Sequence, residues 1–244
     1  MRSYFAQYGR REPVGQRNTI MAYALGDPSL THWEHMNRNE THMKNFMAAM
    51  SALAASMGGV EVYDFSRVVA AGENEPDRIL VVDVGGGRGH SLEAIFKTTP
   101  NLDMSRCVVE DLPIVIEEAK KLADGELKKA SFVGMDFHTE QPVKGALVYL
   151  IRRCLHDYSD DDSINILQHI RDAMRPDSRL LIVEQVINNP PAAIDAANDI
   201  FMAIIGGKER TRADFEEIAR RAGLEVRDIH RGQANVAVVE CAPV

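Results

Sequence analysis

The most concentrated group of residues that could contact a ligand is a glycine loop. Its sequence, Asp83-Val-Gly-Gly-Gly-Arg-Gly-His90, follows a β-branched run and opens a helical stretch. Glycine lets the backbone approach a ligand closely and adopt dihedral angles that other residues avoid. A dinucleotide loop reads G-x-G-x-x-G, whereas the sixth residue counted from Gly85 is His90. The spacing therefore disfavours a pyrophosphate and favours a nucleoside without phosphates, with a purely structural tight turn as the alternative.

Acidic and aromatic residues follow the next two apolar runs. Glu110 and Asp111 both stand where a carboxylate can bind the two hydroxyl groups of a ribose. Either could instead cap the helix that begins near Pro113. Asp136 and Phe137 suit an adenine, because the carboxylate could bind the exocyclic amine while the ring stacks on the base. By itself this pair would rather indicate a polar strand end with a core phenylalanine.

A histidine after a fourth apolar run could transfer protons. His156-Asp157 follows the run that ends near Ile151. An imidazole titrates near neutrality, so His156 could take a proton from a phenol or an enol. A structural role is the alternative for a lone histidine. The acidic run 160–162 is typical of the first turn of a helix, where carboxylates offset the helix dipole.

Two glutamates could assist that histidine. Glu184 lies inside an apolar run, where a carboxylate must be paired, and His156 at the neighbouring strand end is one candidate partner. A position at the solvated end of the strand is the alternative. Glu209 belongs to a glycine turn, Gly206-Gly-Lys-Glu-Arg-Thr211, and is either a second carboxylate of the site or a solvated charge. The threonine that ends this turn could cap the next helix together with Asp214.

Composition and charge exclude several classes of protein. The chain has 244 residues, with 28 basic and 36 acidic side chains, and the resulting charge of −8 argues against a dedicated nucleic-acid binder. An apolar fraction of 45% is ordinary for a globular protein. The three scattered cysteines, Cys107, Cys154 and Cys241, fit a reducing compartment. The polar residues 1–13 predict no signal peptide, and the apolar stretch 46–60 is too interrupted to span a bilayer. We therefore expect a cytoplasmic protein without membrane contact.

Strand and helix patterns alternate from residue 78 onward. Strands are expected at 79–84, 106–110, 131–135, 146–151, 179–186, 225–230 and 236–240, and helices at 91–97, 113–123, 162–174, 194–205 and 212–222. This alternation implies right-handed βαβ units and a doubly wound sheet. Only a few residues around Gly232 join the last two strands, so we expect an antiparallel hairpin there. Residues 1–75 show no strand signals and predict helices within 31–57, followed by a polar linker at 72–77.

In their order and spacing, these segments resemble the plant and fungal O-methyltransferases of the caffeate type. The resemblance covers roughly residues 26–240, and Tyr149-Leu-Ile-Arg-Arg153 favours the fungal branch. Its motifs are Val82-Asp-Val-Gly-Gly-Gly87, Asp111-Leu-Pro113, Leu155-His-Asp157 and Gly206-Gly-Lys-Glu-Arg-Thr211. It implies an α/β fold of the Rossmann-like class I methyltransferase type in residues 76–244, with seven mostly parallel strands and a C-terminal antiparallel hairpin. Residues 1–75 would be a short helical segment before it.

The resemblance also implies a cofactor, S-adenosylmethionine, and a role for each site residue. The methionine part and the ribose of the cofactor would lie against Asp83, Gly85 and Gly87. Further cofactor contacts would be Asp111 with Leu112 at the ribose, Asp136 with Phe137 at the adenine, and Arg152, where plant enzymes usually have lysine. His156 would be the general base, Glu184 and Glu209 would flank and orient it, and Met50 and Asp157 would lie beside the substrate.

The implied reaction is transfer of the sulfonium methyl group to a phenolic or enolic hydroxyl of a small secondary metabolite. The acceptor would be aromatic or polyketide-like, and no metal is expected to take part. Members of the family form homodimers through a long N-terminal helical and winged-helix region, which also forms one wall of the acceptor pocket. Only the last part of that region, from about Phe5, is expected here. Dimerisation and acceptor binding would then depend partly on residues outside the chain.

Three hypotheses remain open from the sequence. The first is an O-methyltransferase. The second keeps the fold and the cofactor but catalyses pericyclisation or another step without methyl transfer, as some relatives of the family do. The third is a non-catalytic binding or regulatory protein. The presence of His156, Glu184 and Glu209 together favours methyl transfer.

Overall fold

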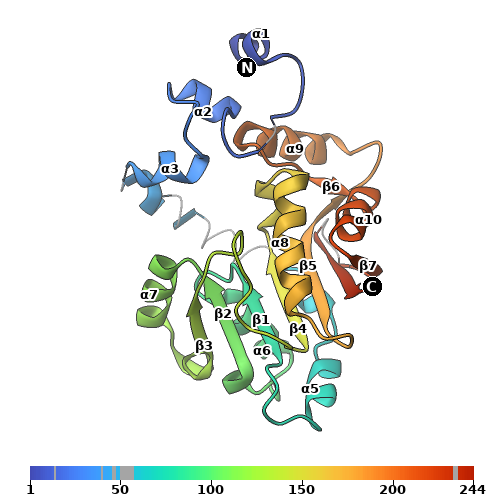
Figure 1. The fold of residues 1–244 in the computed structure, drawn as a ribbon. Coiled ribbons are helices and arrows are strands. Elements are labelled where there is room, and N and C mark those ends of the chain that lie inside the picture. The colour runs from blue at the N-terminus through green and yellow to red at the C-terminus, as the bar shows by residue number, and fades with distance from the viewer. Residues whose placement is uncertain (14, 40, 46–47, 50–57, 233–235) are drawn as a thin grey trace.

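The computed structural model describes residues 1–13, 15–39, 41–45, 48–49, 58–232 and 236–244, and a single sheet forms its centre (Figure 1). The strand order is β3-β2-β1-β4-β5-β8-β7, and the short β6 pairs with β5 beside this path. The strands are β1 (Val81–Val84), β2 (Cys107–Asp111), β3 (Ser131–Gly134), β4 (Val148–Arg152), β5 (Arg179–Ile187), β6 (Arg210–Thr211), β7 (Leu224–Arg231) and β8 (Val236–Pro243). Strands β1 to β5 pair in parallel, whereas β8 runs antiparallel to both β5 and β7. The predicted α/β sheet and its antiparallel C-terminal hairpin are confirmed.

Helices cover both faces of this sheet, so the domain has three layers. They are α5 (Ser66–Gly72), α6 (His90–Thr98), α7 (Pro113–Leu122), α8 (Asp160–Ala173) and α10 (Arg212–Arg221), whereas α9 (Ala193–Ile205) lies beyond one end of the sheet, beside the N-terminal segment (Figure 1). Alternate residues of a strand point to opposite faces. In β4, Tyr149 and Ile151 pack with residues of α8 and α10, while Val148 and Leu150 pack with residues of α5, α6 and α7. Strands buried on both faces in this way explain the uninterrupted apolar runs in the sequence.

Polar residues at the helix starts fix where two of these helices begin. The Ser159 side chain accepts a hydrogen bond from Asp162 N at the start of α8, whose first turn holds the acidic run 160–162. At the start of α10, Thr211 and Asp214 form a complete capping box, as predicted. Helix α5 and the two-residue strand β6 were not predicted, because neither has a repeating apolar pattern long enough to detect.

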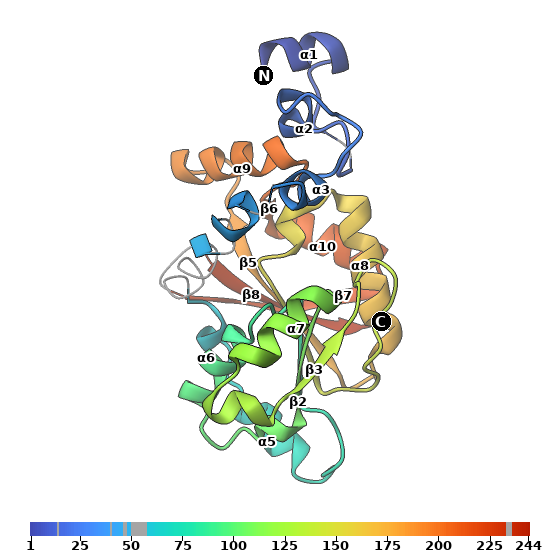
Figure 2. The ribbon, with the colours of Figure 1, turned by 90° about the vertical axis from the view of Figure 1, so that its left-hand side faces the viewer.

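The N-terminal segment consists of short helices that lie at one end of the molecule, with α5 at the other (Figure 2). They are α1 (Arg2–Tyr8), α2 (Ile20–Ala24) and α3 (His32–Asn37), and the described residues of 41–49 are also helical. Helix α2 contacts α9, which joins this segment to the sheet domain. Phe46, Met47 and Met50, which belong to the region 31–57 that was expected to be helical, lie outside the described residues. Within the described parts of the chain, no helix has both the length and the apolar character needed to cross a membrane.

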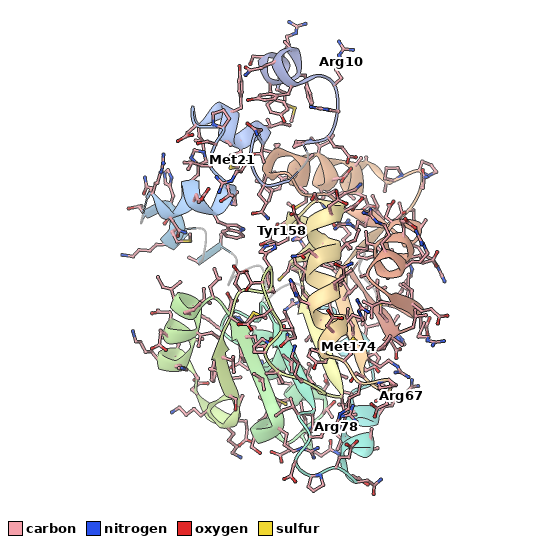
Figure 3. All side chains as sticks on the ribbon, viewed as in Figure 1. Arg10, Met21, Arg67, Arg78, Tyr158 and Met174 are labelled. Atoms are coloured by element: carbon pink, nitrogen blue, oxygen red, sulfur yellow. The ribbon has the colours of Figure 1, made fainter. Side chains whose placement is uncertain are left out.

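A buried arginine joins the loops at the end of the sheet where the strands begin. Arg78 is only 6% exposed, and its Nε donates to Gly145 O at 2.8 Å. Its guanidinium also pairs with Asp177 at 2.6 Å and with Glu75 at 2.7 Å. These bonds connect the segment before β1 with the segments before β4 and β5. In Figure 3, Arg78 lies close to α5, far from Tyr158.

Substitution of Tyr149 by Phe tests one buried contact of the sheet domain. The hydroxyl of this fully buried residue accepts from Ala146 N at 3.3 Å and lies 2.8 Å from Val143 O and 3.0 Å from Ala173 O. Removing it leaves a buried N–H without its acceptor, so we expect Tyr149→Phe to lower the free energy of unfolding by about 1–3 kcal/mol. Urea unfolding followed by circular dichroism measures this loss. A denaturation midpoint equal to that of the unsubstituted chain would contradict the prediction.

Candidate active site

The candidate site lies at the edge of the sheet where the parallel strands end. Strands β1 and β4 are neighbours in the sheet, yet the chain leaves them toward opposite sides, to β2 and to β5. In doubly wound sheets, ligands bind outside the carboxyl ends of the strands at such a switch point. The glycine loop follows β1, Asp111 ends β2, Arg152 ends β4 and Glu184 lies in the second half of β5.

Backbone geometry accounts for the glycines of the loop. Gly85, Gly87 and Gly89 have φ values of +69°, +57° and +85°, which side chains rarely allow. A Cβ atom on Gly85 would also lie 2.9 Å from Cys154 Sγ and 3.3 Å from the ring of Phe137. A Cβ atom on Gly87 would meet nothing within 4 Å, so this part of the loop faces open space.

The two neighbouring acidic residues of β2 have different surroundings. Asp111 Oδ2 accepts from Gly87 N at 2.9 Å and Oδ1 accepts from Leu112 N at 2.7 Å, so this carboxylate lies at the glycine loop. Leu112 is the N-cap of α7 and no side chain caps that helix, so the expected alternative of a capping role does not occur. Glu110 is fully buried and accepts from Gln141 Nε2 at 2.6 Å. Of these two carboxylates, only Asp111 lies at the loop.

Asp83 lies beneath the glycine loop. Its side chain is 1% exposed, and a Cβ atom on Gly86 would lie 2.7 Å from its carboxylate. Neither carboxylate oxygen has a hydrogen bond of ordinary length among the described residues. Burial raises the pKa of Asp83 to about 7, against the opposing effects of nearby Arg152 and Ser91. Asp83 is therefore a buried carboxyl group that supports the loop from below.

Aromatic rings gather beside the glycine loop. Phe137 meets Tyr158 edge-on at a centroid distance of 5.8 Å, and His138 lies 4.8 Å from Tyr158. Trp33 and Gln16, both in the N-terminal segment, lie close enough to the Tyr158 hydroxyl to lower its pKa, against the larger effect of burial, which raises it. Figure 3 shows Tyr158 between the N-terminal helices and the sheet. The sequence reasoning missed Tyr158, although its place two residues after His156 was a usable signal.

Asp136 is more exposed than its neighbour Phe137. Its Oδ1 accepts a hydrogen bond from His138 N at 2.9 Å, a local turn that holds the carboxylate in place. Phe137 packs partly against the core, so the core role considered for it and a contact with a ligand beside Gly85 are compatible.

His156 lies in a buried cluster of carboxylates. It belongs to the 3-10 helix η4 (Leu155–Asp157), and its Nδ1 is 3.2 Å from Glu209 Oε1 and 4.0 Å from Glu184 Oε2. The backbone N–H of His156 donates to Glu184 Oε1 at 3.4 Å. Asp157 Oδ1 is 3.6 Å from Nε2, the other ring nitrogen. The structure therefore brings together the histidine and both glutamates that the sequence singled out.

The charges of this cluster favour a protonated imidazole. Burial lowers the pKa of His156, but the charge of Glu184, the hydrogen bond to Glu209 and the charge of Asp157 outweigh it and raise the pKa to about 9. Burial also raises the pKa of Asp157 to about 6. The ligand atoms of His156, Glu184 and Glu209 all lie within 4.8 Å of one another, close enough to hold a metal ion, a cluster that the sequence reasoning did not foresee. A proton on His156 supplies the positive charge that these two carboxylates require.

The glycine turn before β6 packs directly against the histidine turn. Lys208 N donates to His156 O at 2.9 Å. A Cβ atom on Gly207 would lie 2.0 Å from His156 O, so only glycine permits this approach. The close packing brings Glu209 to the imidazole. The sequence motif 206–211 thus has a steric reason for its second glycine.

Of two further residues expected at the site, the structure describes Arg152 but not Met50. Arg152 is half-buried at the end of β4, where burial lowers its pKa and the nearby charge of Asp83 opposes this. Its guanidinium is therefore close to the carboxylate beneath the glycine loop. Met50, expected beside the substrate, lies outside the described residues.

Comparison with known proteins gives consistent matches along most of the chain. Residues 10–225 match the model of the O-methyltransferase domain family. Methyltransferase cfoD of Aspergillus candidus is 40% identical over 248 residues, an alignment that covers 98% of this chain and 61% of the relative. Methyltransferase fsa4 of a Fusarium species is 37% identical over 242 residues, covering 99% of this chain and 67% of the relative.

Solved structures similar to this chain also match it along almost its whole length. OxaC in complex with SAH and oxaline has a TM-score of 0.89 at 26% identity, covering 99% of this chain and 61% of that one. The LepI complex with SAM has a TM-score of 0.86 at 25% identity, covering 99% and 62%. The chain thus spans between 61% and 67% of the length of the proteins compared.

The protonation of His156 predicts how one part of the stability depends on pH. A histidine pKa raised from 6.5 to about 9 stabilises the folded state fully below pH 6.5, and this stabilisation is lost as the pH rises through about 9. Glutamine cannot be protonated. We therefore expect the difference in unfolding free energy between the unsubstituted chain and His156→Gln to shrink as the pH rises from 6.5 to 9 and above.

Urea unfolding of both proteins at several pH values measures this difference. Asp83 titrates in both proteins, so its contribution cancels in the comparison. A difference that stays constant, or that grows with pH, would contradict the protonated state of His156.

Proposed function

Because the chain belongs to the O-methyltransferase domain family, we propose that it transfers a methyl group from S-adenosylmethionine to a hydroxyl group of a small secondary metabolite. The hydroxyl would be phenolic or enolic, and the acceptor aromatic or polyketide-like. The observation that carries this proposal is the His156 imidazole, whose Nδ1 is close to both Glu184 and Glu209 at the edge of the sheet that also bears the glycine loop.

The residues around the glycine loop fit the cofactor. Gly87 faces open space, and its N–H is held by Asp111, whose carboxylate oxygens have further acceptor capacity for ribose hydroxyls. Phe137 offers a ring beside Gly85, and Asp136 an exposed carboxylate next to it. Two structural neighbours, OxaC bound to SAH and LepI bound to SAM, support this assignment.

When bound, S-adenosylmethionine supplies an electrophilic methyl group on a sulfonium. The chain must remove the proton of the acceptor hydroxyl and hold its oxygen in line with that methyl group. Glu209 holds Nδ1 of His156, which leaves Nε2 as the nitrogen that takes the proton. Glu184 and Glu209 stabilise the imidazolium that results and fix the ring orientation.

Methyl transfer is not the only chemistry known on this fold. One structural neighbour, 25% identical, is described as a pericyclic reaction enzyme. A pericyclisation needs no general base at an acceptor hydroxyl. The buried histidine with its carboxylates favours methyl transfer, and formation of S-adenosylhomocysteine separates the two reactions.

The acceptor atom is the part of the proposal that depends most on the family. Relatives such as cfoD and fsa4 are named simply methyltransferases, whereas afvC of Aspergillus flavus, 32% identical, is named an O-methyltransferase. An acceptor screen should therefore contain phenols, enols and acidic N–H compounds of similar size. Mass spectrometry of the product then identifies the methylated atom. Methylation of nitrogen alone would overturn the hydroxyl assignment.

Substitution of Asp111 by Ala tests the cofactor site. The change removes the carboxylate at the glycine loop. Because one or two charge-assisted hydrogen bonds to the ligand would be lost, we expect calorimetry to show about 10- to 100-fold weaker binding of S-adenosylhomocysteine. Glu110→Gln is the matched control, because Glu110 is bonded to Gln141 rather than to the loop and should leave the affinity unchanged. Equal affinities for Asp111→Ala and the unsubstituted chain would remove Asp111 from the site.

Substitution of His156 by Ala tests the general base. We expect the rate of S-adenosylhomocysteine formation with a responding acceptor to fall about 10²- to 10⁴-fold, with nearly unchanged cofactor affinity. His230→Gln is the control, since that histidine pairs with Glu240 on the β7–β8 hairpin. In the unsubstituted chain kcat/KM should rise with pH toward the His156 pKa of about 9, because only the neutral imidazole accepts a proton. Full turnover by His156→Ala would exclude His156 as the base.

A further inference from the structure

Arg210, directly after Glu209, is the largest fully buried side chain among the described residues. Its relative exposure is 1%, and a buried guanidinium is stable only when its donors are paired. Its partners therefore indicate what it holds in place.

The guanidinium of Arg210 donates hydrogen bonds to both ends of the turn that carries His156. One Nη donates to Leu155 O at 2.8 Å and the other to Tyr158 O at 3.0 Å. These two carbonyls bracket His156 and Asp157 in the chain. Arg210 therefore holds the turn by its backbone, whatever the side chains of that turn do.

The same side chain ties the turn to the start of α8. Arg210 Nε donates to Asp160 Oδ1 at 2.9 Å, and an Nη donates to Ser163 Oγ at 3.1 Å. Ser163 Oγ in turn donates to Leu155 O at 3.3 Å. The planar fork of arginine can reach these acceptors together, whereas the single ammonium of lysine cannot.

The backbone around Arg210 is fixed on the other side as well. Glu209 N donates to Asp199 Oδ1 on α9 at 2.9 Å. Arg210 and Thr211 form β6, whose partners on β5 are Val186 and Ile187, close after Glu184. Glu209 thus contacts the imidazole, and the next residue, Arg210, contacts the turn that carries it. The pairing of β6 with β5, the strand that holds Glu184, fixes the position of both residues along the chain.

We propose that Arg210 is a positioning residue of the site, which sets the distance between the His156 imidazole and the Glu209 carboxylate. The chemical role of His156 rests on the proposed function, but its position relative to Glu209 does not. The ionisable groups that face His156 are Glu184 on β5, Glu209 before β6, and Asp157 and Arg153 on its own segment. Among these, Glu209 is the group whose distance a loosened Arg210 would change most directly.

The test compares two buried arginines in the 244-residue chain. Arg210→Lys keeps the charge but loses the fork, and Arg78→Lys makes the same change at the opposite end of the sheet. Nuclear magnetic resonance of histidine-labelled protein measures the pKa of His156, whose signal is assigned by its loss in His156→Gln. Calorimetry with S-adenosylhomocysteine measures the cofactor site in the same samples.

We expect Arg210→Lys to lower the His156 pKa by about one unit, as Glu209 moves away from the ring. The affinity for S-adenosylhomocysteine should stay within about twofold, because the glycine loop is not touched. Arg78→Lys should reduce stability without shifting the His156 pKa. A folded Arg210→Lys chain with an unshifted His156 pKa, or an equal shift in Arg78→Lys, overturns the proposal.

A second variant serves if Arg210→Lys does not fold. Asp160→Ala removes one partner of Arg210 and should lower the His156 pKa in the same direction by less, and no shift in this variant then overturns the proposal. The measurement needs no acceptor. A chain that forms no S-adenosylhomocysteine but shows the expected pKa shift contradicts the proposed function alone, whereas active enzyme with an unshifted pKa contradicts the role of Arg210 alone.

Discussion

The contact between the His156 imidazole, whose pKa the neighbouring charges raise, and two buried carboxylates is the interaction on which the arrangement of the candidate site depends. Removing charged groups from water costs several kcal/mol each, and their mutual attraction offsets this only at close distances. His156, Glu184 and Glu209 come from three different segments, so no local sequence can hold them together. The geometry must be held by the backbone around them.

Several features of the structure serve this requirement. Glycine at 207 lets the turn before β6 approach His156 O, and β6 fixes the register of that turn against β5. Arg210 binds the carbonyls on either side of His156 and Asp157. Helix α8, with Ser159 as its N-cap, begins immediately after this turn. Each of these features limits the movement of the His156 ring relative to the Glu209 carboxylate.

The strands and the type of sheet could be predicted because parallel strands buried on both faces leave long apolar runs in the sequence. The partnership of Glu184 with His156 followed from the same reasoning, since a carboxylate inside such a run needs a partner. The choice between Glu110 and Asp111 was left open, because it depends on which face of β2 meets Gln141 and which meets Gly87. The role of Arg210 could not be predicted, since two of its four acceptors are backbone carbonyls and all four lie about 50 residues away, which leaves no pattern in the sequence.

The aromatic cluster beside the glycine loop has an experimental consequence. Trp33 is the single tryptophan of the chain, and it lies close to the hydroxyl of Tyr158, whose ring meets Phe137 next to Gly85. An indole is sensitive to the polarity and hydrogen bonding of its surroundings, and here it is connected through two rings to the place proposed for an adenine. The chain therefore carries a built-in fluorophore at the boundary between its N-terminal helices and the sheet domain, and its emission reports on both without any added label.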